Sequence, residues 1–125
     1  QKNKNIVLLK KNWIKIWRGR MNYKEILNDA EDIKTNKNIL ISIGEKIKKK
    51  LPKYQYMGII KILKKDFFKL KKFYKKINNK KIDFTSFLNL VIKNQIIKMN
   101  ISITNKFWYE IDSLNDIKYT QKHIW

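Results

Sequence analysis

The sequence predicts an all-α protein, a small bundle or short solenoid of about six to seven amphipathic helices with a basic N-terminal arm. Only three glycines and one proline occur in 125 residues, too few turn formers for a protein built from many strands. Apolar side chains recur at steps of three and four residues, which is the period of a helix face. Hydrophobic residues make up 43% of the chain, so burial can offset the entropy lost on folding.

Stripes of apolar residues place the expected helices in chain order. The first stripe puts Ile6, Leu9 and Trp13 on one helix face, with lysines on the opposite face. Asn22 and Glu25 have the spacing of a capping box and should open the second helix. The full set of predicted helices spans residues 6–17, 23–33, 40–51, 56–63, 67–77, 84–95 and 107–114.

Residues that start or stop helices support these boundaries. Pro52 should end the third helix, although alternating isoleucines across 39–43 suit a short strand equally well. The fifth helix should begin near Asp66, Asp83 should cap the sixth, and Thr104 should cap the seventh. Each boundary therefore has a local chemical reason.

The expected organisation is one domain with two flanking segments. Residues 1–24 form a basic arm with the first helix, 25–118 a helical domain, and 119–125 a tail. The apolar pattern of residues 51–60 partly recurs at 82–91, an offset of thirty-one residues. Such an offset is typical of a repeated helix pair.

Net charge is the strongest functional signal. Thirty Lys and Arg residues face ten Asp and Glu residues, a net charge of +20, and the chain has no cysteine. Residues 46–81 hold fifteen lysines and a single acid, Asp66, and residues 1–24 hold eight cations and no acid. Self-repulsion of this density favours a polyanionic partner, and two basic surfaces are expected.

Phosphate contacts by lysine give affinity with little sequence discrimination, so RNA is the expected ligand. Trp13 and Trp17 precede both arginines and could stack on bases or form a helix core. The same choice exists for Phe67, Phe68, Phe73 and Tyr74, where helical spacing favours the core. The predicted RNA-binding residues are Lys10, Lys11, Lys15, Arg18, Arg20, Lys46, Lys48, Lys49, Lys50, Lys53, Lys64, Lys65, Lys71, Lys72, Lys75, Lys76, Lys80 and Lys81.

No catalytic, metal or cofactor site is expected. His123 is the only histidine, and no cysteine can act as a nucleophile or metal ligand. No glycine-rich phosphate loop occurs. The acidic residues Glu25, Asp29, Glu31 and Asp32 are interpreted as the solvated face of a helix or as partners for nearby lysines. The chain is therefore predicted not to be an enzyme and to have no small-molecule substrate.

Phe107, Trp108 and Tyr109 form an aromatic cluster in a nearly neutral segment. The cluster is predicted to dock the last helix onto the bundle or to contact a neighbouring protein. The longest apolar runs are far shorter than the roughly 20 residues that cross a bilayer, so no transmembrane segment is expected.

The order of a basic helix, the apolar helix DFTSFLNLVIKNQI and the segment NKFWYEI, all within residues 46–114, resembles helical-hairpin repeats of the heptatricopeptide and octotricopeptide class. The resemblance implies binding to organellar RNA and recruitment into mitochondrial ribosomes. Lys, Ile and Asn supply sixty-four of the 125 residues, which indicates an AT-rich genome.

The expected function is that of a structural, RNA-binding subunit of a large ribonucleoprotein such as a mitochondrial ribosome, with rRNA and neighbouring proteins as partners. Two alternatives remain open. The chain could be a peripheral subunit of a membrane-bound mitochondrial complex that rests on anionic lipid, or a DNA-binding module.

Overall fold

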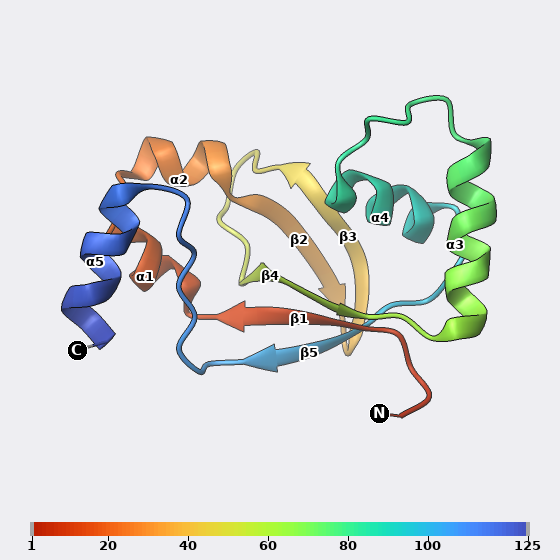
Figure 1. Cartoon of the computed structure of the whole chain (residues 1–125), viewed down its shortest axis with the longest axis horizontal. Helices are drawn as coiled ribbons and strands as arrows, with labels where there is room; N and C mark the ends of the chain where they lie inside the picture. Colours follow the sequence, from red (N-terminus) through yellow and green to blue (C-terminus); the bar gives the residue numbers. More distant parts are fainter. Residues whose placement is uncertain (1, 125) are drawn as a thin grey trace.

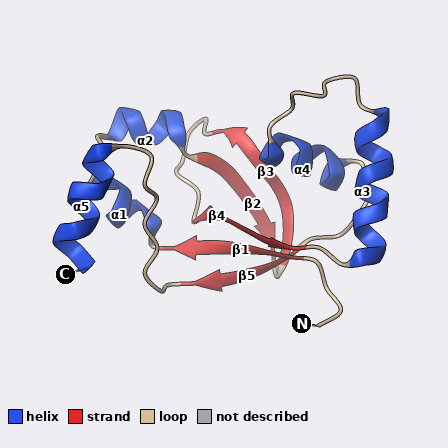
Figure 2. Ribbon diagram, viewed as in Figure 1, coloured by secondary structure: helices blue, strands red, loops and turns tan. Residues whose placement is uncertain are grey.

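A computed structural model describes residues 2–124, and it shows a mixed α/β fold in which one five-stranded sheet is flanked by helices at both ends (Figure 1). The prediction of an all-α bundle or helical repeat is therefore wrong, because the chain contains both helices and strands, and the strands form a sheet (Figure 2). The elements are β1 (Ile6–Lys11), α1 (Trp13–Arg18), α2 (Tyr23–Asp29), β2 (Glu31–Asn36), β3 (Ile39–Lys46), β4 (Tyr54–Lys61), α3 (Lys64–Lys76), α4 (Phe84–Lys93), β5 (Asn100–Thr104) and α5 (Leu114–Ile124).

The strand order in the sheet is β2-β3-β5-β1-β4. Strands β1 and β5 run parallel, whereas β4 pairs antiparallel with β1, and β3 pairs antiparallel with β2 and β5. The Gln55 side-chain amide of β4 donates to the Glu31 carbonyl of β2 (3.3 Å) and accepts from the Glu31 N–H (2.9 Å). The two edge strands therefore meet through this side chain.

The main core lies between the sheet and helices α3 and α4. Val7 of β1 and Ile43 of β3 are fully buried there and belong to one cluster with Leu70 of α3 and with Leu88 and Val91 of α4. Apolar residues on one sheet face and one stripe of each helix are thus removed from water together.

A second, smaller core fills the other end of the molecule. The buried rings of Trp13 and Trp17 from α1 pack with Ile26 of α2, with ring centroids of the two tryptophans 5.1 Å apart. Ile47 and Leu51, from the loop between β3 and β4, pack against the same cluster. This core confirms the interpretation of both tryptophans as core residues.

The first apolar stripe belongs to two elements and not to one helix. Val7 and Leu9 of β1 are buried in the core. After β1 the backbone turns at Asn12, whose φ is 57°, and α1 begins at Trp13. β-branched residues favour extended backbone because their χ1 angle is restricted in helices. Isoleucine-rich segments of this chain consequently form strands wherever a pairing partner exists.

The turns explain why glycine and proline were poor guides to strand number. The hairpin between β2 and β3 turns at Lys37 and Asn38, and Lys37 itself adopts a φ of 52°. Gln95 has a φ of 56° after α4. Residues other than glycine thus occupy left-handed positions, which carry no obvious sequence signal.

Several local predictions are confirmed. Asn22 and Glu25 form the capping box of α2, with Glu25 N–H donating to Asn22 Oδ1 at 2.9 Å and Asn22 N–H donating to Glu25 Oε2 at 2.7 Å. Asp83 Oδ1 accepts from the Ser86 N–H at 2.9 Å and caps α4. Helices α3 and α4 occupy nearly the ranges expected for the fifth and sixth helices.

The C-terminal part differs from expectation. Thr104 ends β5 and caps no helix, and residues 105–113 are irregular. The last described helix is α5, which includes much of the segment expected to be a tail. None of the helices within residues 2–124 has the length and apolar character needed to cross a membrane.

Candidate functional site

The first basic surface consists of Lys11 at the end of β1, helix α1, and residues 46–53, which run from the end of β3 through the loop before β4. Tertiary contacts hold these parts together. The buried indole of Trp13 donates through Nε1 to the Pro52 carbonyl at 3.0 Å. This bond, with the packing of Ile47 and Leu51, brings the loop lysines beside α1. The exposed cations of this surface are Lys11, Lys15, Arg18, Lys46, Lys48, Lys49, Lys50 and Lys53.

The second basic surface is α3 with the turn after it, at the opposite end of the molecule from α1 (Figure 1). Its one acid, Asp66, is buried and accepts from Lys69 Nζ at 2.7 Å and from Asn5 Nδ2 at 2.8 Å. The exposed lysines of this helix that form no ion pair with Asp66 are Lys64, Lys65, Lys71, Lys72, Lys75 and Lys76. The lysine-rich segment 46–81 is thus divided between two ends of the fold.

The turn after α3 closes the helix with a lysine. Lys80 Nζ donates to the backbone carbonyls of Tyr74 at 2.6 Å, Lys75 at 2.9 Å and Ile77 at 2.7 Å. A cation at this position complements the negative end of the helix dipole. Lys80 therefore stabilises the helix end. Both Lys80 and Lys81 are exposed.

The aromatic residues of α3 have different environments. Phe73 packs against the main core, and Tyr74 meets Phe87 edge to face with centroids 5.7 Å apart. Phe67 and Phe68, in contrast, are 57% and 55% exposed. The expectation that all four rings lie in the core holds for Phe73 but not for Phe67 or Phe68.

Two predicted RNA contacts are placed inside the protein. The Arg20 side chain is 3% exposed and pairs with Asp116 (Nη1 to Oδ1, 3.0 Å) and Glu110 (Nη2 to Oε2, 3.4 Å). Lys10 is also 3% exposed, and its Nζ donates to Asn105 Oδ1 at 3.3 Å. Neither cation is displayed on the outer surface, because each is enclosed by residues about ninety positions later in the chain.

The predicted protein-contact cluster is divided as well. Trp108 packs against the second core, so it holds the C-terminal part of the chain on α1 and α2. Tyr109 lies near Tyr119, with centroids 6.2 Å apart. Phe107 alone is freely displayed, with 87% of its surface exposed.

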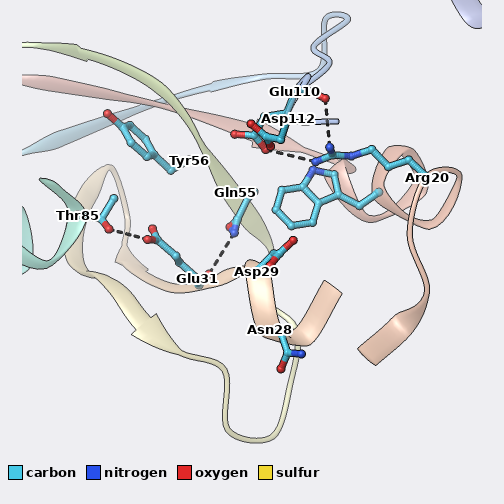
Figure 3. A pocket seen from close by; sticks show the side chains of 10 residues that line it. Arg20, Asn28, Asp29, Glu31, Gln55, Tyr56, Thr85, Glu110 and Asp112 are labelled. Atoms are coloured by element: carbon cyan, nitrogen blue, oxygen red, sulfur yellow. Dashed lines mark hydrogen bonds and ion pairs between the residues drawn. The ribbon is translucent and has the colours of Figure 1, made fainter. Parts of the chain in front are cut away.

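An acidic pocket of about 510 Å³ opens beside the second core (Figure 3). Four carboxylates line it, namely Asp29, Glu31, Glu110 and Asp112, together with Arg20. Asp29 and Glu31 come from the end of α2 and the start of β2, whereas Glu110 and Asp112 come from the irregular segment before α5. Trp17 and Tyr56 contribute aromatic surface to the same pocket.

The acids of this pocket are held in different ways. Burial raises the pKa of Glu31, although Thr85 donates a hydrogen bond to its Oε1 (2.5 Å) and thereby opposes the shift. Burial and the neighbouring Asp112 raise the pKa of Glu110, which Arg20 opposes. A cation entering the pocket would lower both pKa values, because it would favour the ionised carboxylates.

The acids predicted to form a solvated helix face or to pair with nearby lysines have separate roles, and the pairing holds for Asp32. Glu25 completes the capping box, and Asp32 lies 3.6 Å from Lys34 Nζ. Only Asp29 and Glu31 line the pocket. Nothing local links them to Glu110 and Asp112, about eighty residues later, so the pocket could not be found from the sequence.

Among residues 2–124 no group of three or more His, Asp or Glu side chains is arranged to hold a metal ion. His123 lies on α5, where its Nδ1 is 2.7 Å from the Tyr119 carbonyl oxygen. The comparisons with known proteins contribute no assignment: no protein family matches the chain, and no curated protein is detectably similar to it.

Proposed function

We propose that this chain binds RNA through phosphate contacts made by its two basic surfaces, as a structural component of a ribonucleoprotein. The observation that carries the proposal is α3, on which six exposed lysines form no ion pair with Asp66, since that acid is buried and bound by Asn5 and Lys69. Lysines of this kind displace the counterions condensed on nucleic-acid phosphates, and the release of those counterions favours binding.

The spacing of the lysines strengthens the electrostatic argument. Lys71 and Lys75, and likewise Lys72 and Lys76, stand four residues apart on α3. Like charges at this spacing destabilise a helix by about 0.2–0.5 kcal/mol per pair. A polyanion that lies along the helix removes this repulsion, so binding and helix stability are coupled.

Exposed aromatic rings favour single-stranded RNA over a duplex. Phe67 and Phe68 are more than half exposed next to Lys64, Lys65 and Lys71. Unpaired bases stack on such rings with little dependence on sequence. The proposal therefore does not depend on helical-hairpin repeats, which this fold lacks.

Titration of the whole chain with a fluorescent oligouridylate at several salt concentrations tests the proposal. With about six phosphate contacts to a single strand, the slope of log K against log salt should be about −4. Replacement of Lys72, Lys75 and Lys76 by Gln should reduce the slope by about 2. The matched control replaces Lys106, Lys118 and Lys122 by Gln, which removes the same charge from outside both basic surfaces.

Equal loss of affinity in the two triple variants would reject a localised RNA site in favour of net charge alone. Binding to vesicles with anionic headgroups, but not to RNA, would support the peripheral-membrane alternative instead. Preference for duplex DNA over the oligouridylate would support the DNA-binding alternative.

A second candidate function is the binding of a small organic ammonium ion in the acidic pocket. It is favoured by the carboxylates of Asp29, Glu31 and Asp112, which line a pocket of about 510 Å³ together with the rings of Trp17 and Tyr56. The fourth carboxylate, that of Glu110, already pairs with Arg20. Aromatic faces and carboxylates both attract such cations. Titration with butylammonium should shift the NMR signals of Glu31 and Asp112, whereas butanol should not, and equal shifts would reject the idea.

A further inference from the structure

We infer that the pocket at the carboxyl ends of β1 and β5 binds a small molecule that carries an anionic group on a flat ring. The pocket has a volume of about 400 Å³, and its lining includes Lys10, Asn12, Asn105, Phe107, Tyr119 and His123. Among the cations of the two basic surfaces, Lys15 alone lines this pocket. The inference is argued from Lys10 and the aromatic rings, so it does not rest on RNA binding.

The topology of the sheet creates the pocket. Strands β1 and β5 are parallel neighbours, and Lys10 pairs with Thr104 near their ends. Asn12 follows β1 and Asn105 follows β5, and the two amides meet, with Asn12 Nδ2 3.4 Å from Asn105 Oδ1. The crevice beyond the carboxyl ends of parallel strands is where α/β sheets usually bind ligands.

Lys10 supplies the central argument. It is 3% exposed, and its Nζ has a hydrogen bond to the neutral Asn105 amide. No carboxylate belongs to the pocket lining among the described residues. A cation removed from water without an opposite charge is costly, and an anionic ligand would compensate for that cost.

The charge state of Lys10 agrees with this view. Burial lowers the pKa of the Lys10 ammonium, because loss of hydration disfavours the charged form. An anion placed next to the ammonium group would raise this pKa again. The ligand and the proton on Lys10 therefore bind cooperatively.

An imidazole also borders the pocket. His123 Nδ1 lies 2.7 Å from the Tyr119 carbonyl oxygen, which can only accept, so Nδ1 carries a proton. Lys15, exposed on α1, also contributes to the lining.

Aromatic rings define the rest of the ligand. The rings of Tyr119 and His123 lie with centroids 4.1 Å apart, and Tyr109 adjoins Tyr119. Phe107 is 87% exposed although it is large and apolar. A flat ring between these side chains would cover Phe107 and gain stacking contacts, whereas an inorganic anion would not.

Titration of the ¹⁵N-labelled chain with phenyl phosphate, benzoate, inorganic phosphate and benzyl alcohol tests the site. Phenyl phosphate or benzoate should give saturable shifts at residues 10–12 and 104–107, and their comparison identifies phosphate or carboxylate as the preferred anion. Inorganic phosphate should bind at least about tenfold more weakly, and benzyl alcohol should not saturate. Absence of saturable shifts with both aromatic anions would overturn the inference.

Three variants separate the two parts of the ligand. Lys10→Met should raise the Tm and lose at least about tenfold in affinity for the aromatic anion, while the exposed-lysine control Lys24→Met should change neither. Phe107→Ala should weaken binding of the aromatic anion but not of inorganic phosphate, and it leaves the fold intact because Phe107 is exposed. Unchanged affinity of Phe107→Ala for the aromatic anion would exclude a site for the ring. This test remains valid if Lys10→Met does not fold, because it uses a different variant.

Discussion

The guanidinium of Arg20 and the carboxylate of Asp116, 96 residues apart in the chain, form a buried ion pair with Nη1 3.0 Å from Oδ1. Asp116 Oδ2 also accepts from the Ser113 N–H and hydroxyl, each at 2.8 Å. The pair joins the turn after α1 to the first turn of α5. The C-terminal helix is therefore held by charge and hydrogen bonds as much as by apolar contact.

Loss of one partner of this pair should be strongly destabilising. Arg20→Met leaves the Asp116 carboxylate buried without its cation, and the free energy of unfolding should fall by about 3–5 kcal/mol in urea denaturation. In the double variant with Asp116→Leu the loss should be smaller, because no uncompensated charge remains. A loss as large as the sum of the two single variants would show that the pair is not coupled.

Stability should respond to pH in two opposite ways. Burial raises the pKa of Glu31 and of Glu110 above the ordinary 4.5, so their protonation stabilises the fold as pH falls toward that value. Hydrogen bonds from Lys69 and Asn5 lower the pKa of Asp66 below 3.8, so the stability it contributes is lost only at lower pH. For Asp116, burial opposes ionisation, but bonds from Ser113 and Arg20 outweigh it and also lower the pKa.

Urea midpoints between pH 7 and pH 3 measure this balance. Relative to the unmodified chain, Glu31→Gln should lack the stabilisation that appears as pH falls toward 4.5, because an amide takes up no proton. Asp66→Asn should lose stability at pH 7 but show less further loss below pH 3.8. Parallel curves for Glu31→Gln and the unmodified chain would contradict the assignment.

Two glycines with positive φ should respond differently to alanine. Gly58 has a φ of 75° and open space around the position of an added Cβ, so Gly58→Ala should cost only the backbone strain, about 1–2 kcal/mol. Gly44 has a φ of 79°, and its added Cβ would lie 3.0 Å from the Thr85 backbone carbon, so Gly44→Ala should cost more. Thermal unfolding of both variants gives the comparison, and equal costs would indicate that α4 moves freely.

The Trp13 indole should control the order of the loop 46–53. Trp13→Phe keeps a ring in the second core but leaves the Pro52 carbonyl without its donor, at a cost of about 1–3 kcal/mol. Amide exchange in residues 46–51 should become faster as the loop loosens. Trp17→Phe is the control, since Trp17 packs in the same core and makes no bond to this loop. Equal exchange in the two variants would show that the bond is not what holds the loop.

Features that depend on neighbouring residues were predictable from the sequence. The capping box of Asn22 and Glu25 and the Asp83 cap were found because a cap needs a given side chain three residues from a backbone N–H. Helices α3 and α4 were found because apolar residues that recur at the period of a helix, with polar residues on the other face, indicate an amphipathic helix. Strands β1 and β5 were missed because their partners are more than ninety residues apart.

The candidate sites divide in the same way. The lysines of α3 and of the loop 46–53 are exposed, as the charge of this segment predicted, because charged side chains usually remain in contact with water in any fold. Arg20 and Lys10 did not follow this rule, because Asp116 and Asn105 reach them only in the folded chain. The acidic pocket likewise needs Glu31 and Asp112, which no local pattern relates.

The amino-acid sequence alone determined the charge of this protein, its helix caps and its two most amphipathic helices, because these follow from side chains within one or two turns of each other. The tertiary structure alone decided that isoleucine-rich segments pair as strands and that the lysine-rich segment is divided between two ends. It also decided that the side chains of Lys10 and Arg20 are buried while the other predicted cations are exposed. Strand hydrogen bonds and buried charges depend on partners brought together only by folding, and their energies outweigh local preference.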